Sequence, residues 1–301
     1  IGKRKIRQMD TFITNLKHSF ENGGILKKLL FINIGLFILV RLIGVVLMLF
    51  RWDDLPVLLY LQLPSSLELL LVRPWTLITY MFTHYDFIHI LFNMLWLYWF
   101  GNLFLRYFNE RQLGGLYLLG GLAGALFFVA GYNLFPYFRE EASFSYLMGA
   151  SASVMAIVFA ISFYQKEIEV NLLLIGRIKL IYLALFTLLI DFLAMTSDNA
   201  GGHLAHIGGA LLGIWFASRY TQGRDLTAPI NRLIDKIVNL RKRKPKMTVT
   251  YGGRSNKDWD YNARKQQEAA DLDAILDKLK RSGYGSLSAN EKKQLFDASK
   301  K

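Results

Sequence analysis

Long apolar runs separated by short polar segments make up most of the chain up to residue 220. A helix that crosses the hydrocarbon core of a membrane, about 30 Å thick, needs roughly 20 residues. Six segments are long enough: residues 29–50, 77–104, 113–135, 146–164, 178–195 and 203–220. The pattern therefore predicts an all-α fold, a polytopic membrane protein built as a bundle of six transmembrane helices.

Basic residues are concentrated in the segments that this bundle puts on one side. They gather before the first span, between the second and third, after the fourth and behind the sixth, and the formal net charge is +13. Because Lys and Arg in short loops mark the cytoplasmic side, we expect both termini to be cytoplasmic. The opposite side then carries residues 51–76, a loop long enough to be functional. A solvated surface loop fits these residues equally well.

The same pattern divides the chain into four parts. They are a basic cytoplasmic arm (1–28), the membrane domain (29–220), a basic amphipathic helix with a linker (221–265) and a small helical tail module (266–301). The amphipathic helix, "APINRLIDKIVNLRKRKPK" from residue 228, suits anionic lipid at the cytoplasmic face. We expect no nucleic acid as a partner.

The tail module carries signals for helix ends. Gly283 is a plausible helix stop, and Ser288 followed by Glu291 predicts a capping box. We expect two short helices there, preceded by a flexible linker over residues 247–266.

The absence of cysteine excludes a disulfide framework, a thiolate nucleophile and any metal site built on Cys. Ser, His, Asp and Glu remain as the residues able to carry chemistry. The N-terminal residues contain no apolar core followed by a small-residue cleavage site, so we expect no signal peptide.

Polar residues inside membrane spans are costly, so each is a candidate for function, although many only bond one helix to another. The candidates are Arg41, His84, His89, Asn93, Asn102, Ser151, Ser153, Asp191, His203 and His206. The predicted orientation puts Ser151 five residues, or roughly 8 Å, below the outer end of its span. His206, His89 and Asn93 fall at a similar depth, which indicates a shared site.

The chemistry that these four residues can share is acyl transfer. A histidine base makes a serine oxygen nucleophilic, and further donors stabilise the oxyanion. A zinc site built from His84, His89, His203 and His206 is a weaker alternative. Gly209 and Gly213 put two small residues on one face of their helix, so this helix can approach the helix of Ser151 closely. His206 then comes within reach of Ser151.

Four segments resemble conserved blocks of the rhomboid family of intramembrane serine proteases. They are "RPWTLITYMFTH" from Arg73, "HYDFIHILFNMLWLYWFGN" from His84, "GASAS" from Gly149 and "AHIGGALLG" from Ala205. The resemblance covers about residues 28–220. It implies a six-helix bundle and an endopeptidase that cuts transmembrane protein substrates without a metal or other cofactor. The tail resembles that of some bacterial rhomboids, and we expect a multi-pass protein of a bacterial inner membrane.

The resemblance also implies residue roles. Ser151 matches the nucleophile and His206 the general base, while His89, Asn93 and the Ser151 backbone N–H match the oxyanion donors. His84 matches a histidine near the active-site entrance, and His203 has no catalytic counterpart. Gly149, Gly209 and Gly213 support the site.

One residue departs from the family pattern. Ala152 stands where the family most often has glycine, which raises the question whether its methyl group disturbs Ser151. The family mechanism uses a Ser–His dyad, and we expect Asp191 to be a buried side chain that is either neutral or hydrogen-bonded rather than an acid that orients His206. The rival readings are a catalytically inactive rhomboid-like protein that binds membrane clients and a small transporter that moves protons on His and Asp.

Overall fold

A computed structural model of the chain describes residues 14, 17–52, 55–172, 176–197, 199–241 and 256–299. It divides into two units, Ile1–Lys242 and Arg243–Lys301, and each is described by itself. Much of the basic arm, and most of the basic run at 241–246, lie outside the described residues.

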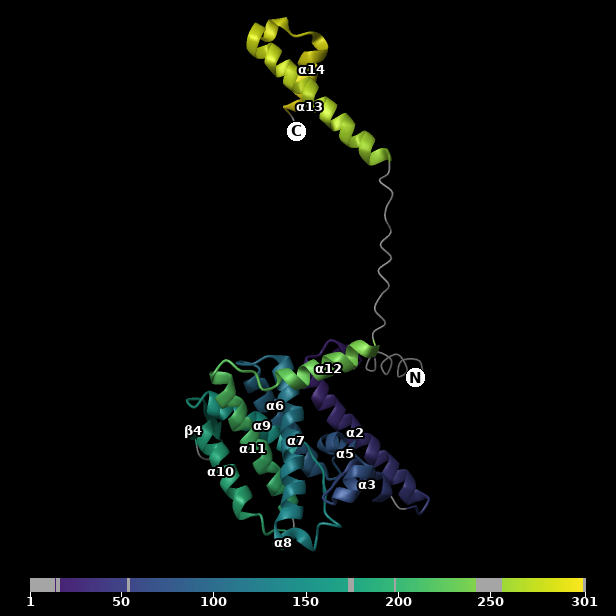
Figure 1. The fold of residues 1–301 in the computed structure, drawn as a ribbon, viewed down its shortest axis with the longest axis vertical. Coiled ribbons are helices and arrows are strands. Elements are labelled where there is room, and N and C mark those ends of the chain that lie inside the picture. The colour runs from purple at the N-terminus through teal and green to yellow at the C-terminus, as the bar shows by residue number, and fades with distance from the viewer. Residues whose placement is uncertain are drawn as a thin grey trace, which may run out of the picture. The chain divides into compact units, whose positions relative to one another are not determined.

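The first unit is mostly helical, and a helix forms within each of the six apolar segments (Figure 1). These helices are α2 (Ile25–Leu49), α6 (Phe87–Phe104), α7 (Glu110–Leu134), α9 (Ser151–Tyr164), α10 (Leu180–Leu193) and α11 (Ala200–Thr221). By length and composition α2, α6 and α7 can cross a membrane, and α9 and α10 are shorter apolar helices.

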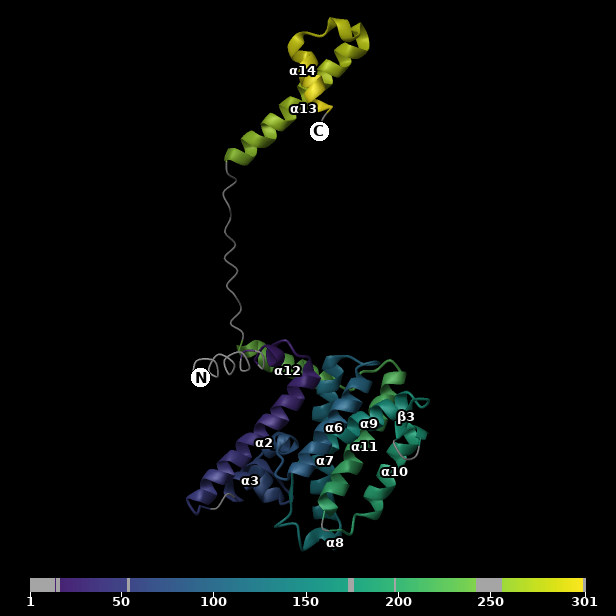
Figure 2. The same ribbon diagram turned by 180° about the vertical axis from the view of Figure 1, so that it is seen from behind.

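Helices α7, α9 and α11 pack closely in the middle of this unit, as the views from both sides show (Figures 1 and 2). A Cβ added to Gly209 would lie 2.1 Å from the carbonyl oxygen of Ala152, and one added to Gly213 would lie 2.4 Å from that of Ala156. Only glycine permits this approach between the backbones of α11 and α9. The close packing predicted from the two glycines is therefore present.

The second apolar segment is not one helix, contrary to the prediction. It contains α5 (Thr76–Thr79), a 3-10 turn (Tyr80–Phe82), an extended stretch and then α6. The Asp86 side chain accepts a hydrogen bond from the backbone N–H of His89 at 2.8 Å. This N-cap satisfies a donor that the helix itself leaves unpaired, so α6 begins at Phe87.

The fourth apolar segment also differs from its prediction, because α9 begins at Ser151 itself rather than five residues earlier. The residues before it form β2 (Tyr146–Leu147), which pairs antiparallel with β1 (Leu63–Pro64). A second antiparallel pair joins β3 (Glu169–Leu172) to β4 (Gly176–Lys179). The fold is thus helical with two small ribbons rather than purely helical.

The long loop before α5 is folded. It contains α3 (Leu55–Leu61), β1 and α4 (Leu67–Val72). The Arg73 guanidinium donates to the carbonyl of Leu59 at 3.1 Å, and the Trp75 indole donates to that of Tyr60 at 2.9 Å. These bonds tie α3 to the start of α5, so the described part of this loop is not simply solvated chain.

Two of the polar residues predicted within spans have local partners. The Arg41 guanidinium lies 4.6 Å from the centre of the Tyr85 ring, a cation–π contact between α2 and the stretch before α6. Asn102 donates to the carbonyl of Tyr98 at 2.7 Å, within its own helix. Arg41 thus joins two elements of the fold, and Asn102 is hydrogen-bonded within α6.

Helix α12 (Ala228–Arg241) follows α11 and lies across the ends of the bundle helices (Figures 1 and 2). Asp235 forms an ion pair with Arg111 at the start of α7. Asn231 donates to the carbonyl of Arg111 at 3.1 Å. These contacts fix α12 to α7 and leave Leu233, Ile237 and Val238 exposed.

The second unit contains α13 (Asn256–Ser282), a 3-10 turn (Tyr284–Ser286) and α14 (Ala289–Ala298). Gly283 has φ +74°, and the capping box of Ser288 and Glu291 is formed, so both predicted helix ends are confirmed. The prediction of a linker over 247–266 is wrong from residue 256 onward, because α13 is 27 residues long. Residues 247–255 lie outside the described residues.

Candidate active site

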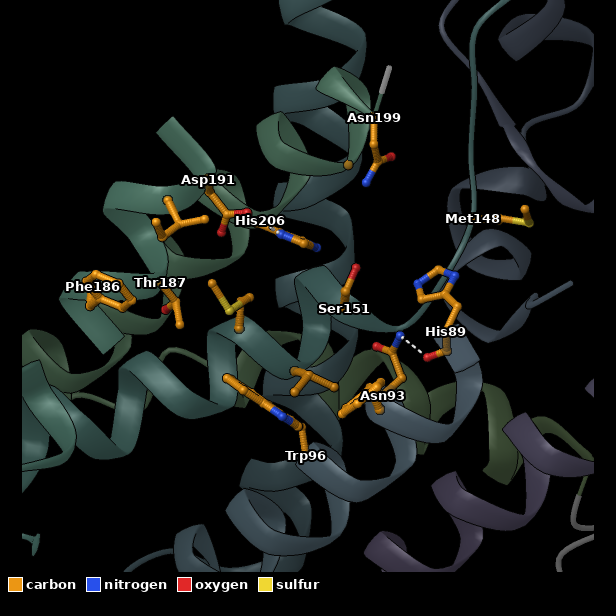
Figure 3. Close-up of a pocket in the computed structure, with 15 residues that line it drawn as sticks. His89, Asn93, Trp96, Met148, Ser151, Phe186, Thr187, Asp191, Asn199 and His206 are labelled. Carbon is orange, nitrogen blue, oxygen red and sulfur yellow. Dashed lines mark hydrogen bonds and ion pairs between the residues drawn. The ribbon is translucent and has the colours of Figure 1, made fainter. Parts of the chain in front are cut away.

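The four residues predicted to share one depth line a single pocket of about 410 Å³ (Figure 3). Ser151 comes from α9, His206 from α11, and His89 and Asn93 from α6. Helix α10 adds Asp191 and the apolar side chains of Phe186 and Ile190. The pocket therefore combines a few polar groups with mostly apolar walls, as ligand-binding sites commonly do.

Ser151 is the first residue of α9, and the turn before it depends on Gly149. Gly149 has φ +117°, and a Cβ there would lie 2.7 Å from Cε1 of His89. Its N–H donates to the carbonyl of Tyr80 at 2.9 Å. Because the first N–H groups of a helix have no intrahelical acceptor, the backbone at Ser151 presents donors to the pocket.

The His84 side chain is hydrogen-bonded to the turn that precedes α9. Its Nε2 accepts a hydrogen bond from the backbone N–H of Ala150 at 3.2 Å, and its ring meets that of His89 edge to face at 5.2 Å. The His84 side chain is fully buried and is not among the residues that line the pocket, and its match to a histidine near the active-site entrance stays a prediction. Sequence alone did not indicate this contact with the serine turn.

His206 lies on the opposite side of Ser151 from His89, and its ring and the Ser151 hydroxyl project into the same space (Figure 3). Within the part of the chain that the structure describes, no hydrogen bond of 3.5 Å or less joins the two side chains. Catalytic hydrogen bonds are often longer without substrate and tighten in the complex. The side chains of Ser151 and His206 therefore face the same space in the pocket but are not hydrogen-bonded to each other.

Asp191 is bonded to this histidine. Nδ1 of His206 and Nδ1 of His203 each lie 2.8 Å from the same oxygen, Oδ1 of Asp191. Asp191 is buried and hydrogen-bonded, which is one of the two states expected for it, but its partners are His206 and His203 rather than groups remote from the pocket. The sequence holds one signal, because Asp191 stands four residues before the end of the 178–195 segment and His206 three residues after the start of the 203–220 segment, and both of these ends lie on the outer side in the predicted topology.

Asn93 donates one amide hydrogen to the backbone carbonyl of His89 at 2.9 Å, one turn earlier in α6 (Figure 3). An asparagine amide has two hydrogens, and the second remains for a ligand in the pocket. His89 and Asn93 lie on the same face of α6 and both line the pocket. They are positioned to donate to an atom held near Ser151.

Ala152 and Ser153 point away from the pocket, toward α7. A Cβ added to Gly124 would lie 2.5 Å from the Ala152 methyl, and one added to Gly121 would lie 2.9 Å from the Ser153 hydroxyl oxygen. The Ser153 hydroxyl has no hydrogen-bond partner among the described residues, so the two serines face different surroundings.

The histidines do not form the four-residue cluster considered for zinc. His84 pairs with His89, and His203 with His206, with ring centres 5.2 Å and 6.0 Å apart. Among the described residues, Asp191, His203 and His206 have donor atoms within 4.8 Å of one another, close enough to hold a metal ion. Hydrogen bonds already join these atoms, so the cluster is satisfied without an ion.

The helices and the pocket define a multi-pass, helical membrane protein. A model of the Rhomboid domain matches residues 72–222, about half of the chain. The chain belongs to the Rhomboid domain family. A second model, a family of unknown function (DUF6576), matches residues 255–301.

Two relatives show the range of this similarity. RHOMBOID-like protein 12, mitochondrial, of Arabidopsis thaliana is 30% identical over 161 residues, which are 50% of this chain and 48% of the relative. The human Presenilin-associated rhomboid-like protein, mitochondrial, is 29% identical over 160 residues, 48% of this chain and 37% of the relative. The match thus spans about half or less of each relative. Both are mitochondrial, so they give no support to the expected bacterial membrane.

Proposed function

We propose that this protein is an intramembrane serine endopeptidase with Ser151 as nucleophile and His206 as general base. The observation that carries the proposal is the meeting of the Ser151 hydroxyl and the His206 ring in one pocket whose other wall holds His89 and Asn93 (Figure 3). Membership of the Rhomboid domain family supports it.

In the proposed reaction, Nε2 of His206 takes the hydroxyl proton of Ser151 while Oγ bonds to the carbonyl carbon of the substrate. The tetrahedral intermediate then breaks its C–N bond, and the leaving amine takes the proton from His206. His206 then takes a proton from water while the water oxygen bonds to the acyl carbon, and it gives this proton to Oγ of Ser151 as the C–Oγ bond breaks. The carboxyl product leaves, and the Ser151 hydroxyl is restored.

The negative oxygen of each intermediate needs donors that are already in place. The free backbone N–H groups at the start of α9, the second amide hydrogen of Asn93 and the ring of His89 supply them. The positive end of the α9 dipole also stabilises this negative oxygen. Removal of the Asn93 side chain therefore lowers kcat, by about 100-fold or more for a donor of this kind.

The proposed substrate is a transmembrane segment of another protein that enters the pocket from the bilayer. Phe92 and Trp96 of α6 and Phe186 and Ile190 of α10 line the pocket and fit an apolar chain. A helix has to unwind locally before its peptide bond reaches Ser151, because its carbonyls are otherwise hydrogen-bonded. Small or helix-breaking residues near the scissile bond are therefore expected.

The proposal also includes the division of the chain into parts and the side of the membrane on which its ends lie. Residues 29–220 form the membrane domain, with the basic arm at 1–28 and the tail on the cytoplasmic side, as the positive-inside rule requires. Residues 221–265 carry the amphipathic helix, which lies on anionic lipid, and residues 266–301 form a separate helical module. No nucleic acid takes part.

The test uses the purified protein in detergent, with a model transmembrane substrate and a fluorophosphonate probe that labels activated serines. Wild type is expected to cleave the substrate and bind the probe, and Ser151→Ala to do neither. Ser153→Ala is the matched control, since Ser153 stands two residues after Ser151 and its hydroxyl faces α7. This variant should cleave the substrate and bind the probe as wild type does. If Ser151→Ala cleaves as well as wild type, the proposal is wrong.

Two other outcomes identify the rival functions. Capture of the substrate by wild type without cleavage or labelling indicates a client-binding protein. Proton movement across vesicles that is lost in Asp191→Ala indicates a transporter, which the cluster of Asp191, His203 and His206 would favour.

A further inference from the structure

A single carboxylate oxygen lies within hydrogen-bond distance of two imidazole rings at the edge of the pocket. Oδ1 of Asp191 lies 2.8 Å from Nδ1 of His206 and 2.8 Å from Nδ1 of His203. Asp191 comes from α10 and both histidines from α11, so the contact joins two helices. Asp191 is buried, with 6% of the residue's surface exposed.

These distances assign the protons on both rings when Asp191 is ionised. An ionised carboxylate only accepts hydrogen bonds, so each Nδ1 carries a hydrogen and donates it. Nε2 of each neutral ring is then free of a proton. Since Nδ1 of His206 faces Asp191, its Nε2 is at the opposite side of the ring, which projects into the pocket toward Ser151 (Figure 3).

We propose that Asp191 is a positioning residue that holds His206 in the tautomer and orientation needed for proton transfer. This inference rests on the proposed function. The pair of Ser151 and His206 thereby becomes a three-residue arrangement, in which the carboxylate comes from α10. Asp191 keeps its charge throughout and takes no proton from His206.

The carboxylate also acts during the reaction. When His206 accepts the proton of Ser151 it becomes a cation, and the negative charge of Asp191 at 2.8 Å stabilises it. The other titratable groups facing this ring are His203 on α11 and His89 on α6, and neither imidazole can carry a negative charge. Asp191 therefore supplies the negative charge next to the base.

His203 provides the comparison that separates positioning from simple helix tethering. It bonds the same oxygen over the same distance, yet it does not line the pocket. If the carboxylate only tied α10 to α11, loss of either contact would act through stability alone. If it positions His206, loss of Asp191 has a larger effect on catalysis than loss of His203.

The first experiment measures kcat, KM and thermal stability of Asp191→Ala and His203→Ala. For Asp191→Ala we expect kcat to fall on the order of 100-fold with little change in KM, the size of a general-base contribution. His203→Ala leaves one imidazole on Asp191, and we expect kcat within about tenfold of wild type, as for the loss of one donor. Equal losses of kcat that follow equal losses of stability would overturn the inference.

The second experiment needs no activity and so separates this inference from the proposed function. Nitrogen-15 NMR of histidine-labelled Ser151→Ala protein reports which ring nitrogen of His206 carries the proton. We expect the Nδ1–H form, replaced by a mixture of tautomers when Asp191→Ala is added. An unchanged tautomer in the double variant contradicts the inference. Failure of wild type to cleave or label contradicts only the proposed function.

Discussion

The methyl group of Ala152 lies against Gly124 of α7, where an added Cβ would approach it to 2.5 Å. The side chain thus packs away from Ser151, into a space that a glycine on the neighbouring helix leaves open. Ala152 was the departure from the family pattern in the serine motif. Its contact indicates that the extra methyl is accommodated between α9 and α7 rather than within the site.

Gly124→Ala is therefore expected to overpack this contact and destabilise the protein by about 1–3 kcal/mol. Ala152→Gly in the same chain removes the facing methyl and should restore part of the loss. The rescue is partial, because the added Cβ also lies 3.1 Å from the Ala205 carbonyl oxygen and 3.2 Å from the Tyr80 hydroxyl. Thermal unfolding of the three variants checks this. Simple addition of the two single effects would contradict the contact.

Gly209→Ala is expected to push α11 away from α9 and to lower proteolysis by more than tenfold, because a 1 Å shift of a catalytic group costs about 100-fold. The new Cβ would lie 2.1 Å from a backbone oxygen, which has no flexible side chain to move. Gly35→Ala is the matched control, since nothing lies within 4 Å of a Cβ there. Cleavage assays and melting curves measure both. Full activity of Gly209→Ala would show that the two helices are not held this closely.

The meeting of Ser151, His206, His89 and Asn93 could be predicted because the length of each apolar run and the charge of each loop give an approximate depth. Depth does not give the direction in which a side chain faces. On α10, Ile190 and Phe192 are 47% and 62% exposed while Asp191 is 6% exposed. Hydropathy treats these neighbours as one apolar run, so the bond from Asp191 to His206 was missed.

The starts of α6 and α9 were predicted less well for a similar reason. Residues 77–104 read as one apolar run, yet the Asp86 cap starts α6 at Phe87. Before α9, the pairing of β2 with β1 joins residues more than 80 positions apart, and no local pattern reports such a pairing. His84 reaches Ala150 through the same long-range arrangement.

Gly149→Ala is expected to reduce the probe reaction and substrate cleavage together. Its φ of +117° disfavours any L side chain, and the new methyl would also meet His89 at 2.7 Å. The strain costs at least about 1–2 kcal/mol, and relief of it moves Ser151. Gly176→Ala is a useful comparison, because this glycine also has a positive φ, +84°, with nothing within 4 Å. We expect the fluorophosphonate rate to fall in the first variant and to be retained in the second.

Helix α12 is expected to stabilise the protein on anionic lipid. Leu233, Ile237 and Val238 are exposed on this helix, which also carries Arg232 and Lys236. Each basic residue at an anionic surface contributes about 1 kcal/mol. Arg232→Gln with Lys236→Gln should reduce the rise in melting temperature when phosphatidylglycerol replaces phosphatidylcholine in nanodiscs. An equal rise in wild type and variant would contradict the lipid contact.

The contact of Glu291 with the Ser288 backbone and with Lys278 is expected to make α14 sensitive to acid. Hydrogen bonds from the Ser288 N–H and the Lys278 ammonium lower the pKa of Glu291 from its ordinary value of 4.5 to about 2. Because the folded-state pKa is the lower one, the stabilisation is fully present above about pH 4.5 and is lost as pH falls toward 2.

Glu291→Gln in the full-length protein tests this link between charge and helix stability. At pH 7 the variant should exchange the amide hydrogens of α14 faster than wild type does, because it lacks the charged partner of Lys278. At about pH 2.5 the difference should narrow, since Glu291 is then protonated in the unfolded segment and folding of α14 has to release that proton, which offsets most of the stabilisation. Comparison of the two proteins at each pH cancels the pH dependence of intrinsic exchange. A difference of the same size at both pH values would show that the ionised form of Glu291 does not stabilise α14.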